Sequence, residues 1–410
     1  MAIQYPVLVN GFPNKDKYLN FYKKIFQKLR AKGFTISVGC QATFTDSTFG
    51  EAKLSQDVNN WYNHGPIGTQ LDSQRYLTEK TQMLQTIIDE LAPDYLTVEM
   101  EPQTQYVNLK GLVNYDAASF TSYINYYLEN LNKGNVKIGA GAGTWNDIKY
   151  FDAAASIPGC DFLDMHIYPV NRDYFVNKVF QVDSIASKYN KEIIIGEAWC
   201  DKETDSELSS VTNPVANSAN ISARDFFDYY QSVDTLFVKA IVNTSYLVNS
   251  RATCFFWPTI LFGYLAYDST VYNGMSSNQI IHEGQQIGYQ RMLNKQPSAA
   301  GLFLQRLLKD SSATGIVKQI DSIDGYTIFQ NYPNPFNPTT NISYNLPARG
   351  FVSIKVYDTL GRQIKTLVNE TQDTGFHNAI FSADKLPSGI YFYSIEAGNF
   401  QQSKPMVLLK

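Results

Sequence analysis

Apolar residues follow two alternating patterns along residues 1–258 of the chain. Short apolar runs of strand length are separated by longer segments in which apolar residues line only one helical face. The clearest helical segment follows Asp72, carries Tyr76, Met83 and Ile87 on one face, and stops at Pro93. Strands that alternate with helices in this way predict a parallel sheet covered by helices.

The pattern predicts seven strands and five long helical segments. The expected strands span residues 7–9, 34–38, 95–100, 136–139, 162–166, 192–195 and 253–256. The expected helices lie within residues 14–33, 72–93, 117–131, 174–189 and 223–242. This arrangement favours an α/β fold of the (β/α)8 TIM-barrel type over an open nucleotide-binding sheet. The first strand is not followed by Gly-x-Gly-x-x-Gly, which also counts against a dinucleotide-binding fold.

A closed barrel of this type has eight strands, one more than the pattern provides. If the strand ending at Glu197 is the seventh and the strand ending at Trp257 is the eighth, the missing strand is the first. The chain also begins at Met1 without the basic region and apolar core of a signal peptide. We therefore expect a chain that lacks its natural N-terminus, including the first barrel strand.

The last 80 or so residues show the shorter period of two that is typical of half-buried strands. Turn sequences separate these runs at residues 348–350, 360–361 and 387–389. The alternating apolar positions are Ile342, Tyr344, Leu346, Val352, Ile354, Val356, Tyr391, Tyr393 and Ile395. This pattern predicts a small all-β, Ig-like sandwich after an extended, proline-rich lead-in. We expect a large domain at 1–310, a linker at 311–328 and the sandwich at 329–410.

Four motifs give the sandwich a more specific interpretation. They are NYPNPFNPTT at 331–340, VYDTLGR at 356–362, SGIYFY at 388–393 and MVLLK at 406–410. With these motifs the tail resembles the type A C-terminal sorting domain of the bacterial type IX secretion system. The resemblance implies export to the surface or the medium of a Bacteroidota-like bacterium, with the secretion machinery as a partner. The fold pattern alone would also suit a carbohydrate-binding sandwich.

Composition narrows the classes of partner. The net charge is -4, and no run of Lys or Arg indicates a nucleic acid or an anionic membrane as a partner. No stretch reaches about 18 apolar residues, so we expect no membrane span. Aromatic residues make up 14% of the chain and charged residues only 18%, a balance that suits either sugar stacking or an aromatic-rich core.

The four cysteines, Cys40, Cys160, Cys200 and Cys254, include no Cys-x-x-Cys pair, which argues against a zinc site. An exported protein could form disulfides among them, but the spacing selects no pairing.

Active sites of TIM barrels lie at the carboxyl ends of the strands. Polar and aromatic residues stand at these ends in segments 99–102, 145–146, 166–169, 197–199 and 257–258. With them, residues 5–258 resemble the retaining glycoside hydrolases of clan A. In that clan the fourth strand ends in an acid/base Glu, usually within Asn-Glu-Pro, and the seventh ends in a nucleophilic Glu.

The resemblance implies two catalytic residues, Glu101 as acid/base and Glu197 as nucleophile, and no metal or organic cofactor. Retaining hydrolysis needs the two carboxyl groups about 5–5.5 Å apart. We expect burial and the second carboxylate to raise the pKa of Glu101. Tyr168 would donate a hydrogen bond to Glu197. Either glutamate would alternatively be an ordinary salt-bridged residue at a strand end.

The expected substrate-binding residues are His166, Tyr168, Trp145, Trp199 and Trp257, with Trp257 as the platform under the sugar. His166 would alternatively be a hydrogen-bonded residue of the rim. Trp145 and Trp199 would equally serve as packing residues.

Two residues depart from the pattern of the clan. Met100 stands where the clan usually has an Asn that hydrogen-bonds the 2-hydroxyl of the sugar. Glu99 faces the same side as Glu101 in a regular strand, so it is either the true acid or a buried partner that tunes Glu101.

These residues together predict a secreted glycoside hydrolase that cleaves β-glycosidic bonds with two glutamates. The alternative is a catalytically silent, surface-displayed barrel that binds glycans. A barrel lyase or isomerase would need a metal-binding set of carboxylates and histidines at the rim, which a chain with four histidines does not suggest.

Overall fold

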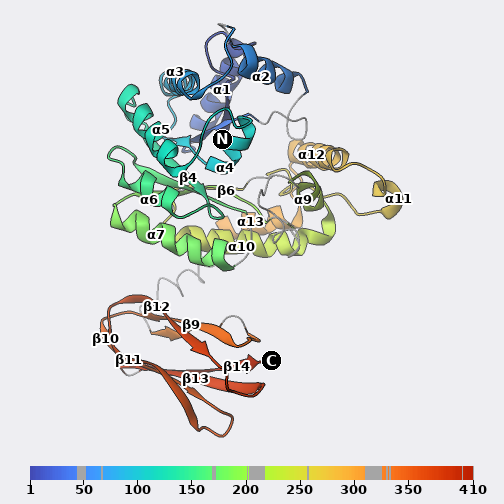
Figure 1. Cartoon of the computed structure of the whole chain (residues 1–410). Helices are drawn as coiled ribbons and strands as arrows, with labels where there is room; N and C mark the ends of the chain where they lie inside the picture. Colours follow the sequence, from blue (N-terminus) through green and yellow to red (C-terminus); the bar gives the residue numbers. More distant parts are fainter. Residues whose placement is uncertain are drawn as a thin grey trace. The chain divides into compact units, whose positions relative to one another are not determined.

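The computed structural model describes residues 1–43, 52–65, 68–168, 172–200, 202, 218–255, 258–309, 326–328, 331, 334–398 and 400–409. The chain forms two compact units, Met1–Lys309 and Asp310–Lys410 (Figure 1). Most of the expected linker at 311–328 lies outside the described residues, so its boundaries remain a prediction. Within the described part, no helix combines the length and apolar character needed to cross a membrane.

A sheet of seven parallel strands organises the first unit, and the strands lie side by side in chain order. They are β1 (Ala2–Tyr5), β2 (Ser37–Ala42), β3 (Tyr95–Glu99), β4 (Lys137–Gly143), β5 (Phe162–Ile167), β6 (Glu192–Ala198) and β7 (Thr253–Phe255). The sheet curls as a half-barrel with helices packed against it. The predicted parallel α/β architecture is therefore confirmed, and its strand number agrees with the seven apolar runs.

Long helices connect the strands, and shorter ones follow the strand ends (Figure 1). Up to β6 they are α1 (Lys15–Arg30), α2 (Ala52–His64), α3 (Ser73–Leu91), α4 (Pro102–Asn108), α5 (Ala117–Asn130), α6 (Lys149–Ser156) and α7 (Lys178–Lys188), with π-helical η1 (Arg172–Asn177). After β6 come α9 (Ser218–Asp225), α10 (Gln231–Leu247), α11 (Ser269–Tyr272), α12 (Ser277–Leu293) and α13 (Ala299–Lys309), with the 3-10 turn η2 (Asp228–Tyr230). Asp72 caps α3 as predicted, because its side chain accepts a hydrogen bond from the backbone N–H of Arg75.

Two local predictions were wrong. The first strand is Ala2–Tyr5 rather than residues 7–9, which form a turn in which Val7 N–H donates to the Gln4 carbonyl over 3.0 Å. Those residues are nonetheless buried, since Leu8 is 0% exposed. None of the helices expected from the apolar pattern covers α2, and Trp61 of this helix packs into the core. Apolar burial is therefore read correctly from the pattern, but the backbone conformation is not.

The second unit is a sandwich of two antiparallel sheets, with strand orders β11-β10-β13-β14 and β12-β9-β8. Its strands are β8 (Thr327–Ile328), β9 (Thr339–Leu346), β10 (Gly350–Tyr357), β11 (Gln363–Gln372), β12 (Gly375–Ser382), β13 (Gly389–Ala397) and β14 (Phe400–Leu408). All nine alternating apolar positions picked out from the sequence are buried between the sheets. The predicted all-β sandwich is confirmed.

Candidate active site

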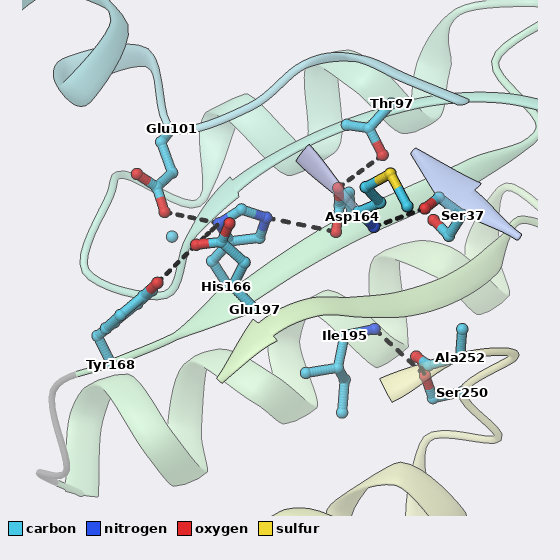
Figure 2. A network of polar contacts seen from close by, with 12 residues as sticks. Ser37, Thr97, Glu101, Asp164, His166, Tyr168, Ile195, Glu197, Ser250 and Ala252 are labelled. Carbon is cyan, nitrogen blue, oxygen red and sulfur yellow. Dashed lines mark hydrogen bonds and ion pairs between the residues drawn. The ribbon is translucent and has the colours of Figure 1, made fainter. Parts of the chain in front are cut away.

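Two glutamates meet at the carboxyl edge of the parallel sheet (Figure 2). Glu197 lies near the end of β6, and Glu101 follows β3 directly, although 96 positions separate them in the chain. One carboxylate oxygen of each, together with a ring nitrogen of His166, lies within 4.8 Å of the others. The fold therefore brings the two predicted catalytic carboxylates to a separation close to that used in retaining glycoside hydrolysis.

His166 stands between the two glutamates. Its Nδ1 lies 2.6 Å from Glu101 Oε1 and 3.7 Å from Glu197 Oε2. The register of the sheet explains this geometry, because His166 and Glu197 are direct partners across β5 and β6, where the ladder is irregular. His166 is 1% exposed. It is therefore part of the buried polar centre rather than a solvated histidine of the rim.

A third carboxylate completes the centre. Asp164 precedes His166 by two positions on β5, so both side chains face the same side of the sheet. Oδ1 of Asp164 lies 3.5 Å from His166 Nε2, and Oδ2 accepts a hydrogen bond of 2.6 Å from the hydroxyl of Thr97. Neither Asp164 nor Thr97 was predicted as a site residue. The signal available in the sequence was the Asp-x-His spacing within one strand.

The charges of this centre perturb its proton affinities. Burial alone would lower the pKa of His166, but the carboxylates of Asp164, Glu197 and Glu101 outweigh burial and hold that pKa well above its ordinary value. Burial in turn raises the pKa of Glu197 to about 7, and the Glu101 carboxylate adds to this effect while the His166 charge opposes it. In its imidazolium form, His166 donates to Glu101 through Nδ1–H and lies at ion-pair distance from Asp164 and Glu197.

Tyr168 and Trp145 lie beside the carboxylates. The hydroxyl of Tyr168 donates to Glu197 Oε2 over 2.5 Å, the contact expected from the sequence. The ring of Trp145 meets the ring of Tyr168 edge to face, with centroids 5.4 Å apart. Trp145 is half-buried at this position.

Trp199 is not brought to this site. Trp199 is 0% exposed and packs in a hydrophobic cluster with Phe226 and Ile260, so it cannot serve as a sugar platform. The ammonium of Lys202 lies 4.5 Å from the centre of its ring. The prediction of Trp199 as a substrate-binding residue was therefore wrong, because burial favours packing of its large ring. Trp257 lies outside the described residues.

Glu99 belongs to the helix layer rather than to the site. Its carboxylate pairs with the ammonium of Lys80 over 2.7 Å, and both side chains are 0% exposed. Tyr127 and Tyr115 also donate hydrogen bonds to it. The pairing of β3 with β4 shifts register between Thr97 and Glu99, which breaks the alternation that would have put Glu99 beside Glu101.

Glu101 itself occupies an unusual backbone conformation. Its φ of 43° and ψ of 66° lie in the left-handed region, where residues other than glycine are uncommon. Glu101 is the residue before Pro102, which begins α4, and its carbonyl accepts a hydrogen bond from Gln105 N–H. This turn between β3 and α4 aims the Glu101 side chain at His166.

A cavity of about 440 Å³ reaches the polar centre from inside the curled sheet. Its lining includes Gln4, Gln41, Met100, Asp164, His166 and Glu197. Met100, which replaces the Asn usual in clan A, is therefore a wall of this cavity and supplies an apolar surface there. Cavities of this size accommodate small ligands.

All four cysteines are free thiols. Burial raises the pKa of Cys40 to about 12 and of Cys160 to about 11, so both remain protonated at neutral pH. The structure thus contains none of the possible disulfide pairings.

Comparison with known proteins assigns the tail. Residues 330–409 match the family model of a secretion system C-terminal sorting domain. The second unit is therefore a type IX sorting domain, as its motifs predicted, and it marks the chain for export. No curated protein matches the chain.

Several solved structures are similar to this chain. They include the endo-beta-1,4-mannanase of Thermotoga petrophila, at 13% identity and a TM-score of 0.35, over 94% of this chain and 82% of that one. A double mutant of the Cellulomonas fimi endo-beta-1,4-mannanase matches at 10% identity and a TM-score of 0.33, over 96% and 82%. Xylanase XynB of Paenibacillus barcinonensis matches at 11% identity and a TM-score of 0.34, over 69% and 80%. Likeness this distant assigns no activity to the chain.

Proposed function

We propose that this protein is an exported retaining glycoside hydrolase that cleaves β-glycosidic bonds. The observation that carries the proposal is the meeting of Glu101, His166 and Glu197 within 4.8 Å at the carboxyl edge of the sheet. Two carboxylates this close allow one to act as a proton donor while the other attacks the same sugar.

In the first step, protonated Glu101 transfers its proton to the leaving glycosidic oxygen. Glu197 attacks the anomeric carbon as the bond to that oxygen breaks, so a glycosyl ester forms on Glu197. In the second step, Glu101 as carboxylate takes a proton from water, and this water displaces Glu197 from the sugar. Tyr168 supports the role of Glu197, since its hydroxyl stabilises the anionic carboxylate.

The raised pKa of Glu197 favours a specific alternative, in which Glu197 is the proton donor and Glu101 the nucleophile. Glu101 receives the shorter contact from His166, and a charge-assisted hydrogen bond from an imidazolium would orient that carboxylate for attack. Both assignments retain the configuration of the sugar, so product stereochemistry alone does not separate them.

Azide rescue separates the two assignments. Glu101→Ala and Glu197→Ala are each assayed on activated aryl β-glycosides with and without azide. Azide replaces a lost nucleophile from the opposite face and gives an α-glycosyl azide, whereas in the acid/base variant it attacks the glycosyl ester and gives a β-glycosyl azide. We expect the α product from the Glu197 variant and the β product from the Glu101 variant. Turnover unchanged from the parent in either variant would contradict the proposed hydrolysis.

A glycan-binding protein without activity is the second candidate, and Met100 favours it. Where clan A usually has an Asn that contacts the sugar, this chain has Met100, whose apolar side chain lines the cavity. Slower migration of the protein in a native gel that contains a soluble β-glycan would show binding. Binding without release of reducing ends over prolonged incubation would support this candidate. We expect release of reducing ends instead.

The sorting domain gives the proposed enzyme its location and one partner. We propose that the type IX machinery carries the chain across the outer membrane to the cell surface or the medium. In a bacterium with that machinery, a fusion of a fluorescent reporter to residues 330–410 behind a signal peptide should reach the surface. The same fusion with Tyr393→Asp, which puts a charge into the sandwich core, should remain in the periplasm.

A further inference from the structure

The polar centre contains a buried residue that the proposed mechanism does not yet use. Asp164 is 3% exposed and lies on the far side of the His166 ring from both glutamates (Figure 2). Nε2 of His166 faces Asp164, whereas Nδ1 faces Glu101 and Glu197. The imidazole therefore bridges the third carboxylate to the catalytic pair.

The surrounding backbone fixes the place of Asp164. A Cβ atom at Gly196 would lie 2.1 Å from Asp164 Oδ1, so the neighbouring strand can pass only because residue 196 is glycine. A Cβ atom at Gly141, on the other side, would lie 1.7 Å from the Asp164 carbonyl oxygen. The Thr97 hydroxyl holds Oδ2. Gly196 on β6 thus makes room for the carboxylate, Gly141 on β4 makes room for the Asp164 backbone, and Thr97 on β3 binds the carboxylate.

Asp164 can balance the positive charge of His166 within this centre. The titratable groups that interact with the His166 ring are Asp164, Glu101, Glu197 and Cys254, and Tyr168 donates to Glu197. If the Asp164 carboxylate balances the imidazolium, this positive charge does not have to be balanced by both glutamates, and the two glutamates can share one negative charge and one proton. Retaining hydrolysis starts from that state, with one carboxylic acid and one carboxylate.

We propose that Asp164, held by Thr97, is a positioning residue that keeps His166 protonated between Glu101 and Glu197. The catalytic consequence of this inference rests on the proposed hydrolysis. The effect of Asp164 on the protonation of His166 does not. As the negative charge moves from one glutamate to the other during the two steps, Nδ1–H has an acceptor in either state. The hydrogen bond moves between the carboxylates while the ring stays paired with Asp164.

The first test follows the imidazole itself by NMR in the full chain. The sequence has four histidines, at positions 64, 166, 282 and 377, so the ring signals are few, and a His166→Gln variant assigns the signal of interest. Asp164→Asn should lower the pKa of His166 by about one unit or more, because a carboxylate at ion-pair distance favours the charged ring. Thr97→Val should lower it less, and Thr97→Ser, which keeps the hydroxyl, should leave it in place.

The second test follows the pH profile of kcat/KM on an aryl β-glycoside. Removal of one negative charge lowers the proton affinity of every group in the cluster, so both limbs of the profile should move to lower pH in Asp164→Asn. A structural loss would reduce kcat without moving the limbs. Tryptophan fluorescence in urea shows separately whether the variant is folded.

The two tests separate the two ideas. If Asp164→Asn folds and shifts neither the His166 signal nor the limbs, the role of Asp164 is refuted while hydrolysis stands. If no substrate is hydrolysed but the His166 pKa falls in Asp164→Asn, the proposed function fails and the pairing of Asp164 with the ring is supported. A shift in both tests supports both.

Discussion

The hydroxyl oxygen of Tyr168 lies 2.5 Å from Oε2 of Glu197, and it donates its proton to that carboxylate. The two residues come from neighbouring strand ends, since Tyr168 follows β5 and Glu197 lies on β6. A phenol that donates to a carboxylate stabilises the charged form of the acid. This contact therefore opposes the burial that raises the pKa of Glu197.

Tyr168→Phe should consequently raise the pKa of Glu197 further and slow hydrolysis. We expect kcat to fall about 10- to 100-fold, with the acidic limb of the pH profile displaced to higher pH. Tyr123→Phe is the matched control, because its hydroxyl donates to the Asn114 carbonyl away from the site. An acidic limb that stays in place in Tyr168→Phe would mean that the hydroxyl does not stabilise the charged glutamate.

The buried pair of Lys80 and Glu99 should contribute strongly to the stability of the first unit. Lys80→Met leaves the Glu99 carboxylate buried without its cation, which should cost about 3–5 kcal/mol of unfolding free energy. Urea unfolding followed by tryptophan fluorescence measures this unit alone, because all four tryptophans lie before residue 258. Lys23→Met, which breaks an exposed pair with Glu90, serves as the control and should change little. An equal loss of unfolding free energy in both variants would show that the buried pair stabilises the unit no more than the exposed pair does.

The first unit should become less stable as the pH rises from 5 to 8. The pKa values of Glu197 and Asp225 are each raised to about 7, foremost by burial, from ordinary values of 4.5 and 3.8. The folded state therefore binds more protons than the unfolded state above pH 5, and the unfolding free energy decreases as the pH rises through 7. The raised pKa of His166 acts in the same direction above pH 6.5.

Urea midpoints at pH 5, 6, 7 and 8, read from tryptophan fluorescence, check this sign. Asp225→Asn removes one of the titrating groups and should flatten the decline. A midpoint that increases steadily from pH 5 to 8 would show that these carboxyl groups are ionised in the folded protein.

The order of strands and the packing faces of the long helices follow from the sequence, because both depend on the period of apolar residues. The prediction of α3 after Asp72 and of the sandwich strands rests on this period alone. The first strand could not be placed in the same way. Residues 7–9 are apolar and buried, yet a turn at Val7 puts the strand at residues 2–5.

The strand ends picked out from the sequence supplied His166, Tyr168 and Glu197, which the structure brings together. The same rule failed for Glu99, because an irregularity in the pairing of β3 turns it towards Lys80. Periodicity contains no information about such a shift in register.

Trp199 shows a second limit. A tryptophan directly after a strand can lie on the rim or pack under it, and only the neighbouring helices decide which. Here Phe226 and Ile260, distant in sequence, enclose the ring.

The left-handed backbone at Glu101 means that the chain accepts a folding penalty at the residue most needed for chemistry. An L-residue pays about 1 kcal/mol in this conformation, and glycine would not. Glu101→Gly should therefore unfold at higher urea than Glu101→Ala, although both lose the carboxylate. At this position the sequence gives up stability to place the proposed proton donor.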